Sequence, residues 1–394
     1  MTVGARPSAE LRQERSRLCW NTIFPWAGSV CAAGYTTGTC AAGAARAVAE
    51  ALLRGSFPAQ VLVDTPAGIP VHLEPEAQES GSDWASCGIR KDGGDDHDVT
   101  NGALIVATVR RTQSGIHIDG GQGVGRVTRP GLNQPVGTAA INSGPRAMIE
   151  AQVRQALLDA GADCGMEVII SVPEGQCLAA KTFNPRLGIE GGISILGSTG
   201  IVRPMSRQAL VDTTRVEMEV HWAEGARDLL MTPGNYGADF AAHQLGLDMR
   251  RAVQCSNYIG DALDNAVNLG FSSLLLVGHI GKLCKLAAGV MDTHSHTADG
   301  RREVFVTHAA LCGAEGPLLR KLYEAVTTDG ALELLIQVGI SGAVLDSIAR
   351  AVGDNLRHRT GNMNTQAILF SQATGLTAMT AGAQELLEKH LVRE

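Results

Sequence analysis

Short apolar runs separated by polar or glycine-rich turns mark the first half of the chain. Five of these runs have the length and residue types of β-strands, at residues 60–65, 69–73, 103–111, 116–118 and 166–171. An alanine-rich run that ends at Arg54-Gly55 and residues 143–160 both have helical spacing. Residues 74–101 form a polar insertion among the strands. Paired strands with few helices are typical of an α+β domain.

The pattern of hydrophobic and polar positions changes after Gly200, where strand, loop and helix patterns alternate. Strands are expected at 229–231, 252–255 and 273–277, and the helices between them at 238–245 and 258–269. This alternation predicts a mostly parallel, doubly wound sheet, which binds ligands in the loops at the carboxyl ends of its strands. Those loops are residues 233–237, 256–260 and 278–282.

The remaining chain is expected to be helical from about 304 to 357, with a last strand at 365–370 and a helix at 381–390. We expect an N-terminal arm at 1–32, an α+β domain at 33–200 and an α/β domain at 201–359. Residues 360–394 could complete the first domain. The fold class is then an α+β domain interrupted by an α/β domain.

The amino-acid composition indicates a globular protein and argues against some classes of partner. The chain has 394 residues, of which 44% are hydrophobic and 19% charged, as in globular proteins with sizeable cores. Aromatic residues make up only 4%, and the formal charge is −7, so nucleic acid and membrane surfaces are poor partners. Nine cysteines without a CxxC pair favour a reducing, cytoplasmic compartment over a disulfide framework. We expect neither a signal peptide nor a transmembrane segment.

The stretch GYTTGTCAA at residues 34–42 leads into the first helix. Thr37 or Thr39 could cap this helix, and its free N–H groups could hold a carboxylate or phosphate. An ordinary capped helix is the alternative interpretation. Cys40 could have a lowered pKa near the helix start, although a small buried packing residue is the more frequent case.

Other candidate loops have weaker signals. The loop Gly278–Lys282 suits an anion, but its spacing and Leu283 exclude a P-loop. The run 121–125 ends at Arg126 and fails the dinucleotide fingerprint. Two histidines one residue apart, His294 and His296, point to opposite faces of a strand and have no cysteine beside them, so we assign no protein-bound metal.

Four long strings together resemble one enzyme family, the cobalt-precorrin-5B (C-1)-methyltransferases of anaerobic cobalamin biosynthesis. The strings occur in the family's order, over roughly residues 33–375: GYTTGTC at 34–40, KDGGDDHDVTNG at 91–102, GSTGIVRPMS at 197–206 and GHIGKLCKLAAGVMDTHSHTAD at 278–299. The chain departs from the family pattern at Cys31-Ala32-Ala33, where family members often carry a Leu-Arg type sequence before GYTTG.

The resemblance implies a transferase that moves a methyl group from S-adenosylmethionine to C-1 of a cobalt corrinoid, with the cobalt carried by the substrate. Candidate bases are His279 and His294, since a histidine titrates near neutral pH. The expected contacts to substrate carboxylates are Thr36, Thr37, Gly38, Thr39, Arg203 and Lys282. The expected cofactor contacts are Asp92, Asp95, Ser198, Thr199, Gly200, Gly234, Asn235, Gly278 and Gly281.

Two other functions stay open at this point. One is a nucleotide-dependent transferase that would use the glycine-rich loops for phosphates, and the other is a non-catalytic corrinoid carrier. The expected partner is a small corrinoid, with a homo-oligomer or transient contact with neighbouring pathway enzymes left open.

Overall fold

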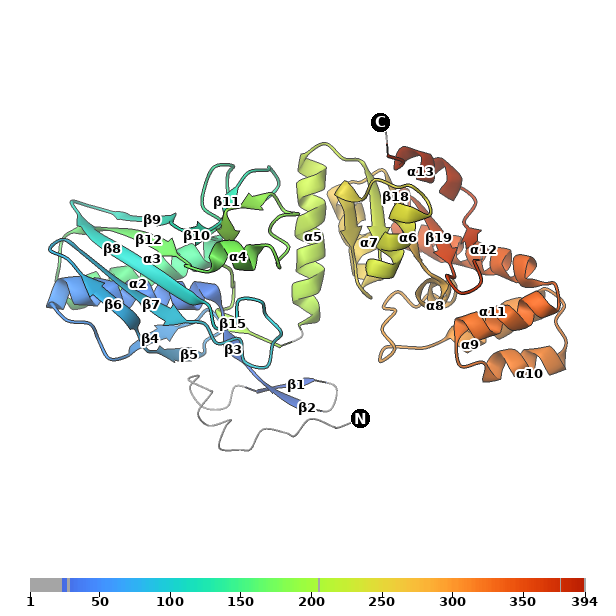
Figure 1. Cartoon of the computed structure of the whole chain (residues 1–394), viewed down its shortest axis with the longest axis horizontal. Helices are drawn as coiled ribbons and strands as arrows, with labels where there is room; N and C mark the ends of the chain where they lie inside the picture. The colour runs from blue at the N-terminus through green and yellow to red at the C-terminus, as the bar shows by residue number, and fades with distance from the viewer. Residues whose placement is uncertain (1–22, 27–28, 205, 376, 393–394) are drawn as a thin grey trace. The chain divides into compact units, whose positions relative to one another are not determined.

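The computed structural model describes residues 23–26, 29–204, 206–375 and 377–392, so most of the expected N-terminal arm lies outside the described residues. The chain divides into two compact units, residues 1–206 and 207–394 (Figure 1). The boundary between the units lies at Ser206, close to the expected boundary at Gly200.

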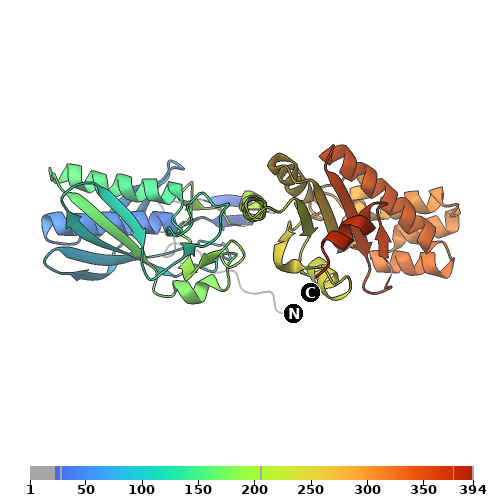
Figure 2. The ribbon, with the colours of Figure 1, turned by 90° about the horizontal axis from the view of Figure 1, so that it is seen from above.

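The first unit is built on a five-stranded sheet in the order β6-β7-β8-β12-β9. Its strands are β6 (Glu76–Ser80), β7 (Trp84–Arg90), β8 (Leu104–Thr112), β9 (Ile116–Gly120) and β12 (Gly165–Ser171). Only the β12–β9 pair is parallel. Helices α2 (Thr37–Arg54) and α3 (Ser143–Asp159) run together along one face of this sheet (Figure 2).

Short elements complete the first unit. They are the hairpin β1 (Ile23–Trp26) and β2 (Ser29–Ala32), then β3 (Gly34–Tyr35), β4 (Val61–Asp64), β5 (Pro70–Leu73), β10 (Gly123–Val124), β11 (Arg126–Val127), α4 (Gly175–Ala179), β13 (Ile189–Glu190), β14 (Gly192–Ile193) and β15 (Ile201–Val202). The two runs 60–65 and 69–73 are confirmed as the antiparallel pair β4–β5. The interpretation of 74–101 as an insertion is wrong, because it contains β6 and β7 of the main sheet.

Alanine explains how α2 packs. Nearly all of its first fifteen residues are buried, and Cys40, Ala41, Ala44 and Ala45 are completely so. Side chains this small let the helix lie close to β7, β8 and α3. The helix ends at Gly55, whose φ of 82° is the left-handed conformation that glycine adopts most easily.

The second unit contains the expected doubly wound sheet. Its order is β17-β16-β18-β19-β20, with β17 (Ala252–Gln254), β16 (Asp228–Thr232), β18 (Ser273–His279) and β19 (Asn364–Phe370) parallel and β20 (Thr377–Met379) antiparallel. Strand β18 is buried on both faces, with Leu274 and Leu276 in one core and Leu275 and Val277 in the other. Burial on both sides explains its continuous apolar run.

Helices cover both faces of this sheet. One core includes residues of α5 (Arg207–Ala223), α7 (Ile259–Leu269), α8 (Ile280–Leu283), η2 (Cys284–Ala288), α9 (Arg301–Leu311), α10 (Gly316–Glu324), α11 (Thr328–Gln337) and α12 (Ser341–Thr360). The other includes residues of α6 (Asn235–His243) and α13 (Ala383–Lys389), with η1 (Met249–Arg251) beside it.

The last strand corrects one expectation about the domains. β19 pairs in parallel with β18 from Ser273↔Asn364 to His279↔Phe370, and residues 364–392 belong to the second unit. The proposal that 360–394 completes the first domain is therefore wrong. The two units are consecutive in the chain, and neither interrupts the other.

Candidate functional site

The carboxyl ends of β16 and β18 lie side by side because these strands pair in parallel. From β16 the chain passes outward to β17, then returns to form β18 on the other side of β16. Such a reversal of strand order leaves a crevice between the two loops, and this is where doubly wound sheets bind ligands. We call this reversal the switch point. Its two loops are Pro233–Gly234–Asn235 and His279 to Lys282.

The backbone at Gly234 has a conformation that only glycine adopts readily. Its φ is 147° and its ψ is −171°, a region closed to side-chain-bearing residues. Asn235 and Tyr236, which follow in the first turn of α6, are exposed. Just before them, the Thr232 side chain is completely buried, and its hydroxyl has no hydrogen-bond partner among the described residues. A strained loop and an unpaired polar group thus meet at the end of β16.

His279 ends β18 and caps α8. Its Nδ1 accepts a hydrogen bond from the Gly281 N–H at 3.1 Å, so a neutral ring carries its proton on Nε2. That Nε2 lies 3.9 Å from Oδ1 of Asp329, which also accepts from the Ser371 hydroxyl at 2.6 Å. In this tautomer the imidazole offers a hydrogen-bond donor rather than a free lone pair.

Lys282 bridges the two loops of the switch point. Its Nζ donates to the Pro233 carbonyl at 3.2 Å, which ties the β18 loop to the β16 loop. Burial lowers the pKa of Lys282 from its ordinary value, and the neighbouring Lys285 lowers it further, while Cys255 opposes the shift. A cation of this kind combines partial desolvation with a position at the crevice, and perturbed groups in such places are typical of functional sites.

The glycines of this loop permit close packing. A Cβ at Gly278 would lie 3.0 Å from Cδ of Pro233, and one at Gly281 would lie 3.1 Å from Nδ1 of His279. Both are tighter than ordinary contacts. The absence of a side chain at Gly278 therefore lets the β18 loop approach Pro233, and its absence at Gly281 lets the β18 loop fold closely on His279.

His294 lies in a loop that a buried lysine holds in place. Lys285 is 4% exposed, and its Nζ donates to the carbonyls of Thr293 at 3.1 Å and Ala298 at 2.8 Å. Thr293 N–H also donates to the carbonyl of Asn257, so this loop is next to the carboxyl end of β17. His294 Nδ1 accepts from the His296 N–H at 3.2 Å, and the two rings stack at 5.2 Å.

The start of α2 in the first unit differs from the expectation. Thr36, rather than Thr37 or Thr39, is the N-cap, and its hydroxyl accepts from the Thr39 N–H at 3.2 Å. The Thr36 and Gly38 N–H groups donate to the carbonyls of Gly200 and Leu196. These N–H groups are therefore occupied and buried. The idea that they hold a carboxylate needs correction, because the helix start instead binds the chain's own residues 196–200.

Residues 197–203 follow the segment that binds this helix start, and they contact it through hydrogen bonds and close packing. The Thr39 hydroxyl donates to the Gly200 carbonyl at 2.7 Å, and a Cβ at Gly197 would lie 2.2 Å from the Thr36 hydroxyl oxygen. Ser198 and Thr199 are exposed, and the Thr199 hydroxyl donates to the Ile201 carbonyl. Arg203 follows β15 and is exposed.

The loop at 91–102 is fixed by its own hydrogen bonds. Asp92 accepts from the Gly94 N–H at 2.8 Å and Asp95 from the Ala32 N–H at 2.7 Å. The Lys91 side chain is only 1% exposed, and its Nζ lies 2.6 Å from Oδ2 of Asp98. One oxygen of Asp92 and one of Asp95 are thus used to shape the loop.

Burial also decides the state of Cys40. It raises the pKa of this thiol to about 12, against the smaller opposing effect of Lys91. The suggestion of a lowered pKa is wrong, and the interpretation as a buried packing residue is confirmed.

The structure groups the candidate residues by unit. In the second unit it brings together Gly234, Asn235, Gly278, His279, Gly281 and Lys282 at the switch point. In the first it brings together Thr36 to Thr39, Ser198, Thr199 and Gly200. Sequence reasoning missed the unpaired Thr232, the clamp at Lys285 and the pair Asp329 and Ser371, which approach His279 from distant parts of the chain.

The described residues contain no cluster of three or more His, Cys, Asp or Glu side chains placed to hold a metal ion. Among their helices, none has both the length and the apolar character that crossing a bilayer requires.

Comparison with known proteins gives consistent results. Residues 27–204 match the family model described as CbiD, and residues 292–381 match that described as CbiD, C-terminal domain. A cobalt-precorrin-5B C(1)-methyltransferase from Ruminiclostridium cellulolyticum is 46% identical over 86% of this chain and 88% of its own. One from Photorhabdus laumondii is 44% identical over 90% and 94%.

One solved structure is also similar. The crystal structure of a cobalamin biosynthesis protein (cbiD) from Archaeoglobus fulgidus has 29% identity and a TM-score of 0.39, and covers 70% of this chain and 86% of that chain. The segment 205–291, which holds both loops of the switch point, lies between the two family-model matches.

Proposed function

Because this chain belongs to the CbiD family, we propose that it is a cobalt-precorrin-5B C(1)-methyltransferase of cobalamin biosynthesis. The observation that carries this function is the identity of 44–46% to relatives of that name, extending over at least 86% of both chains in the two cases described. The methyl donor we propose is S-adenosylmethionine, and the substrate is a corrinoid that brings its own cobalt.

We place the methyl donor at the switch point of the second unit. The residues there fit such a ligand: Gly234 leaves the backbone open to close approach, and the buried Thr232 hydroxyl lacks a partner in the part of the chain that the structure describes. Asn235, Gly278 and Gly281 belong to the same two loops. Asp92, Asp95, Ser198, Thr199 and Gly200 belong to the first unit, where their hydrogen bonds support a role in shaping the loops around a substrate.

A bound sulfonium donor supplies a methyl group that is already electrophilic, so the protein's task is alignment. Holding donor and acceptor in line can contribute roughly 7–11 kcal/mol. Lys282 fixes the two crevice loops to each other through the Pro233 carbonyl, and its ammonium group suits an anionic arm of the substrate. Arg203 remains a candidate for a second carboxylate contact.

The histidines are better suited to donating hydrogen bonds than to accepting protons. In both His279 and His294 the Nδ1 lone pair already accepts a backbone N–H, which leaves Nε2–H as the exposed function of the neutral ring. We therefore propose that His279 and His294 orient substrate or donor groups. A base role would first require that these backbone hydrogen bonds break.

Replacing each histidine by glutamine, which retains an N–H donor, tests this assignment. We expect His279→Gln and His294→Gln to lower kcat less than about tenfold, whereas loss of a general base typically costs 10²–10⁴-fold. Single-turnover rates would measure this. A loss of three orders of magnitude in either variant would restore the base assignment.

Substitution of Gly234 tests where the donor binds. Gly234→Ala forces a side chain into a conformation that costs about 1–3 kcal/mol, so the loop is expected to move and the affinity for S-adenosylhomocysteine to fall at least about tenfold. Gly246→Ala is the matched control, since Gly246 also has a positive φ, 64°, with no atoms near its missing Cβ. Equal affinities in calorimetric titrations of both variants would contradict the placement.

The mass of the corrinoid product tests the reaction itself. The protein is incubated without oxygen with the cobalt-precorrin substrate and methyl-deuterated S-adenosylmethionine. We expect the corrinoid to gain one labelled methyl group at C-1. Binding without label would favour the corrinoid carrier, and ATP binding without any response to S-adenosylhomocysteine would favour the nucleotide-dependent transferase.

A further inference from the structure

At the carboxyl end of β18, a hydrogen-bond donor and an acceptor lie 3.9 Å apart. The donor is Nε2 of His279, which carries the proton of the neutral ring, and the acceptor is Oδ1 of Asp329, in the first turn of α11. This distance is longer than a hydrogen bond, so the two groups do not satisfy each other directly. At such a separation both can instead bond to one polar atom placed between them.

Other contacts fix the orientation of both side chains. The His279 ring accepts the Gly281 N–H at Nδ1, and it meets the Phe370 ring edge to face at 5.6 Å. On the other side, Oδ1 of Asp329 accepts from the Ser371 hydroxyl at 2.6 Å, and Ser371 is itself only 2% exposed. The donor and the acceptor are therefore in place before a ligand binds.

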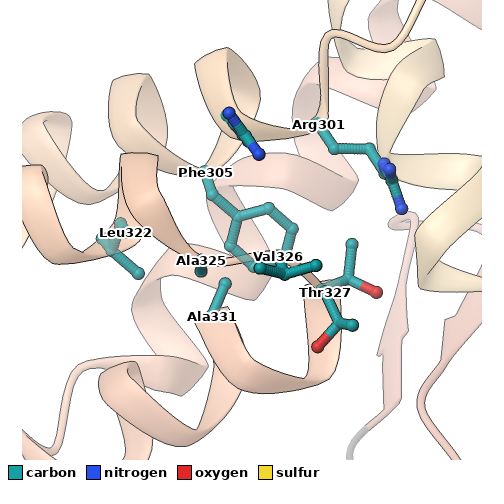
Figure 3. Close-up of a pocket in the computed structure, with 9 residues that line it drawn as sticks. Arg301, Phe305, Leu322, Ala325, Val326, Thr327 and Ala331 are labelled. Atoms are coloured by element: carbon teal, nitrogen blue, oxygen red, sulfur yellow. The ribbon is translucent and has the colours of Figure 1, made fainter.

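The pair is also open to a ligand. The side chains of His279 and Asp329 are 29% and 31% exposed, and Oδ2 of Asp329 has no hydrogen-bond partner among the described residues. The small cavity of Figure 3, which Arg301, Phe305 and Thr327 help to line between α9, α10 and α11, is a separate feature. Its volume of about 10 Å³ admits no more than one water, so it offers a ligand no alternative place.

We propose that His279 and Asp329 together bind a ribose hydroxyl of the methyl donor. A hydroxyl can accept from Nε2–H of His279 and donate to the carboxylate of Asp329 at the same time. The charge of Asp329 repels the carboxylate arms of a corrinoid, and an ammonium group has no lone pair to accept the Nε2–H. The 2′ and 3′ hydroxyls of S-adenosylmethionine meet both requirements; this inference rests on the proposed function.

The pair lies within reach of the loop where we place the donor. Strands β16 and β18 are paired neighbours, and adjacent strands lie about 4.8 Å apart. Lys282 also ties the loop that begins at His279 to Pro233, the neighbour of Gly234. A nucleoside bound beside Gly234 therefore has to cross only one strand spacing to bring its ribose to His279.

Deoxy analogues of S-adenosylhomocysteine test this subsite. The 2′-deoxy and 3′-deoxy compounds each lack one hydroxyl, and calorimetry would measure their affinities and that of the complete ligand. The proteins are the unmodified chain, Asp329→Ala and Ser371→Ala, which keeps the carboxylate but removes the hydroxyl that orients it. Glu333→Gln is the matched control, because it removes an exposed carboxylate from the same helix. Circular dichroism and thermal unfolding would check that each variant folds.

We expect one deoxy analogue to bind the unmodified protein and Glu333→Gln roughly tenfold to a hundredfold more weakly than S-adenosylhomocysteine. In Asp329→Ala this difference should shrink to less than about threefold, because the acceptor of the missing hydroxyl is gone, and Ser371→Ala should fall between. If Asp329→Ala weakens all three ligands by the same factor, or weakens none, only water occupies the gap and the subsite is overturned.

The unmodified protein separates this inference from the proposed function. If it does not bind S-adenosylhomocysteine at all, the assignment of the methyl donor is wrong, and the ribose subsite is overturned with it. If it binds S-adenosylhomocysteine and both deoxy analogues equally well, the methyl donor stands and the ribose subsite alone is overturned.

Discussion

Replacing Lys282 by methionine is expected to lower kcat/KM by about 10²–10³-fold, the usual loss when one preorganised charged or hydrogen-bonding group is removed from an active site. The change removes the bond to the Pro233 carbonyl, which holds the two loops of the switch point together, and also removes the cation from the crevice. Methionine keeps the length and apolar character of the stem, so stability should change little. Steady-state kinetics on the corrinoid measures the effect.

The pH dependence of the activity shows whether Lys282 acts as a charged ammonium group or as a neutral amine. Burial lowers the pKa of Lys282, so a required ammonium group is lost, and activity falls, at a pH below that of an exposed lysine, about 10.4. Lys282→Arg should move this alkaline limb upward, because arginine stays protonated. Lys389→Met, which removes a lysine paired with Asp228 at the other end of β16, is the matched control. Activity that rises with pH would instead indicate a neutral amine acting as base.

Asp98→Asn is expected to reduce the free energy of unfolding by about 3–5 kcal/mol, the usual effect of breaking a buried ion pair. Lys91, at 1% side-chain exposure, would remain buried without the carboxylate that now lies 2.6 Å from its Nζ. The loop 91–102, which passes close to residues 32–35, should loosen at the same time. Urea unfolding measures the change.

A pH titration and a surface pair complete this test. Burial raises the pKa of Asp98, but Lys91 and Thr100 together bring it below the ordinary value. This stability is therefore present above the pKa of an unfolded aspartate, about 3.9, and is lost as pH falls through the lower folded value. Glu150→Gln breaks the exposed Glu150–Arg154 pair and should cost less than about 1 kcal/mol. Similar losses in the two variants would refute the buried-pair argument.

The elements that the sequence predicted well are those whose pattern reflects burial directly. The run at 273–277 became β18 because both of its faces are covered, and the alanine run became α2 because small side chains line a close contact. Strand β7 was missed because acidic and glycine-rich segments surround it, although burial alternates over its first four residues. Helix α5 was missed because most of its side chains are polar and few are buried.

The candidate site was predictable where it depends on local order along the chain. Strand and loop alternation placed Gly234 and Gly278 at the carboxyl ends of β16 and β18, which pair in parallel. Residues that arrive from distant elements gave no such signal: Ser371 follows β19, and Asp329 belongs to α11. The histidine tautomers and the occupied N–H groups of α2 also depend on partners that only the folded chain brings near. For this reason the sequence did not reveal that the Thr36 and Gly38 N–H groups already bind the carbonyls of Gly200 and Leu196.

The hydrogen bonds that join the start of α2 to residues 196–200 have a consequence for folding during synthesis. The bond from the Thr39 hydroxyl to the Gly200 carbonyl joins residues 161 positions apart, and β3 pairs with β15 at a similar separation. At translation rates of about 5–20 residues per second, the ribosome needs roughly 8–30 s to supply the partner. During this interval the Thr36 and Gly38 N–H groups of the helix start lack their partners, so a nascent chain stalled before residue 196 should remain open to proteolysis at its glycine- and threonine-rich start.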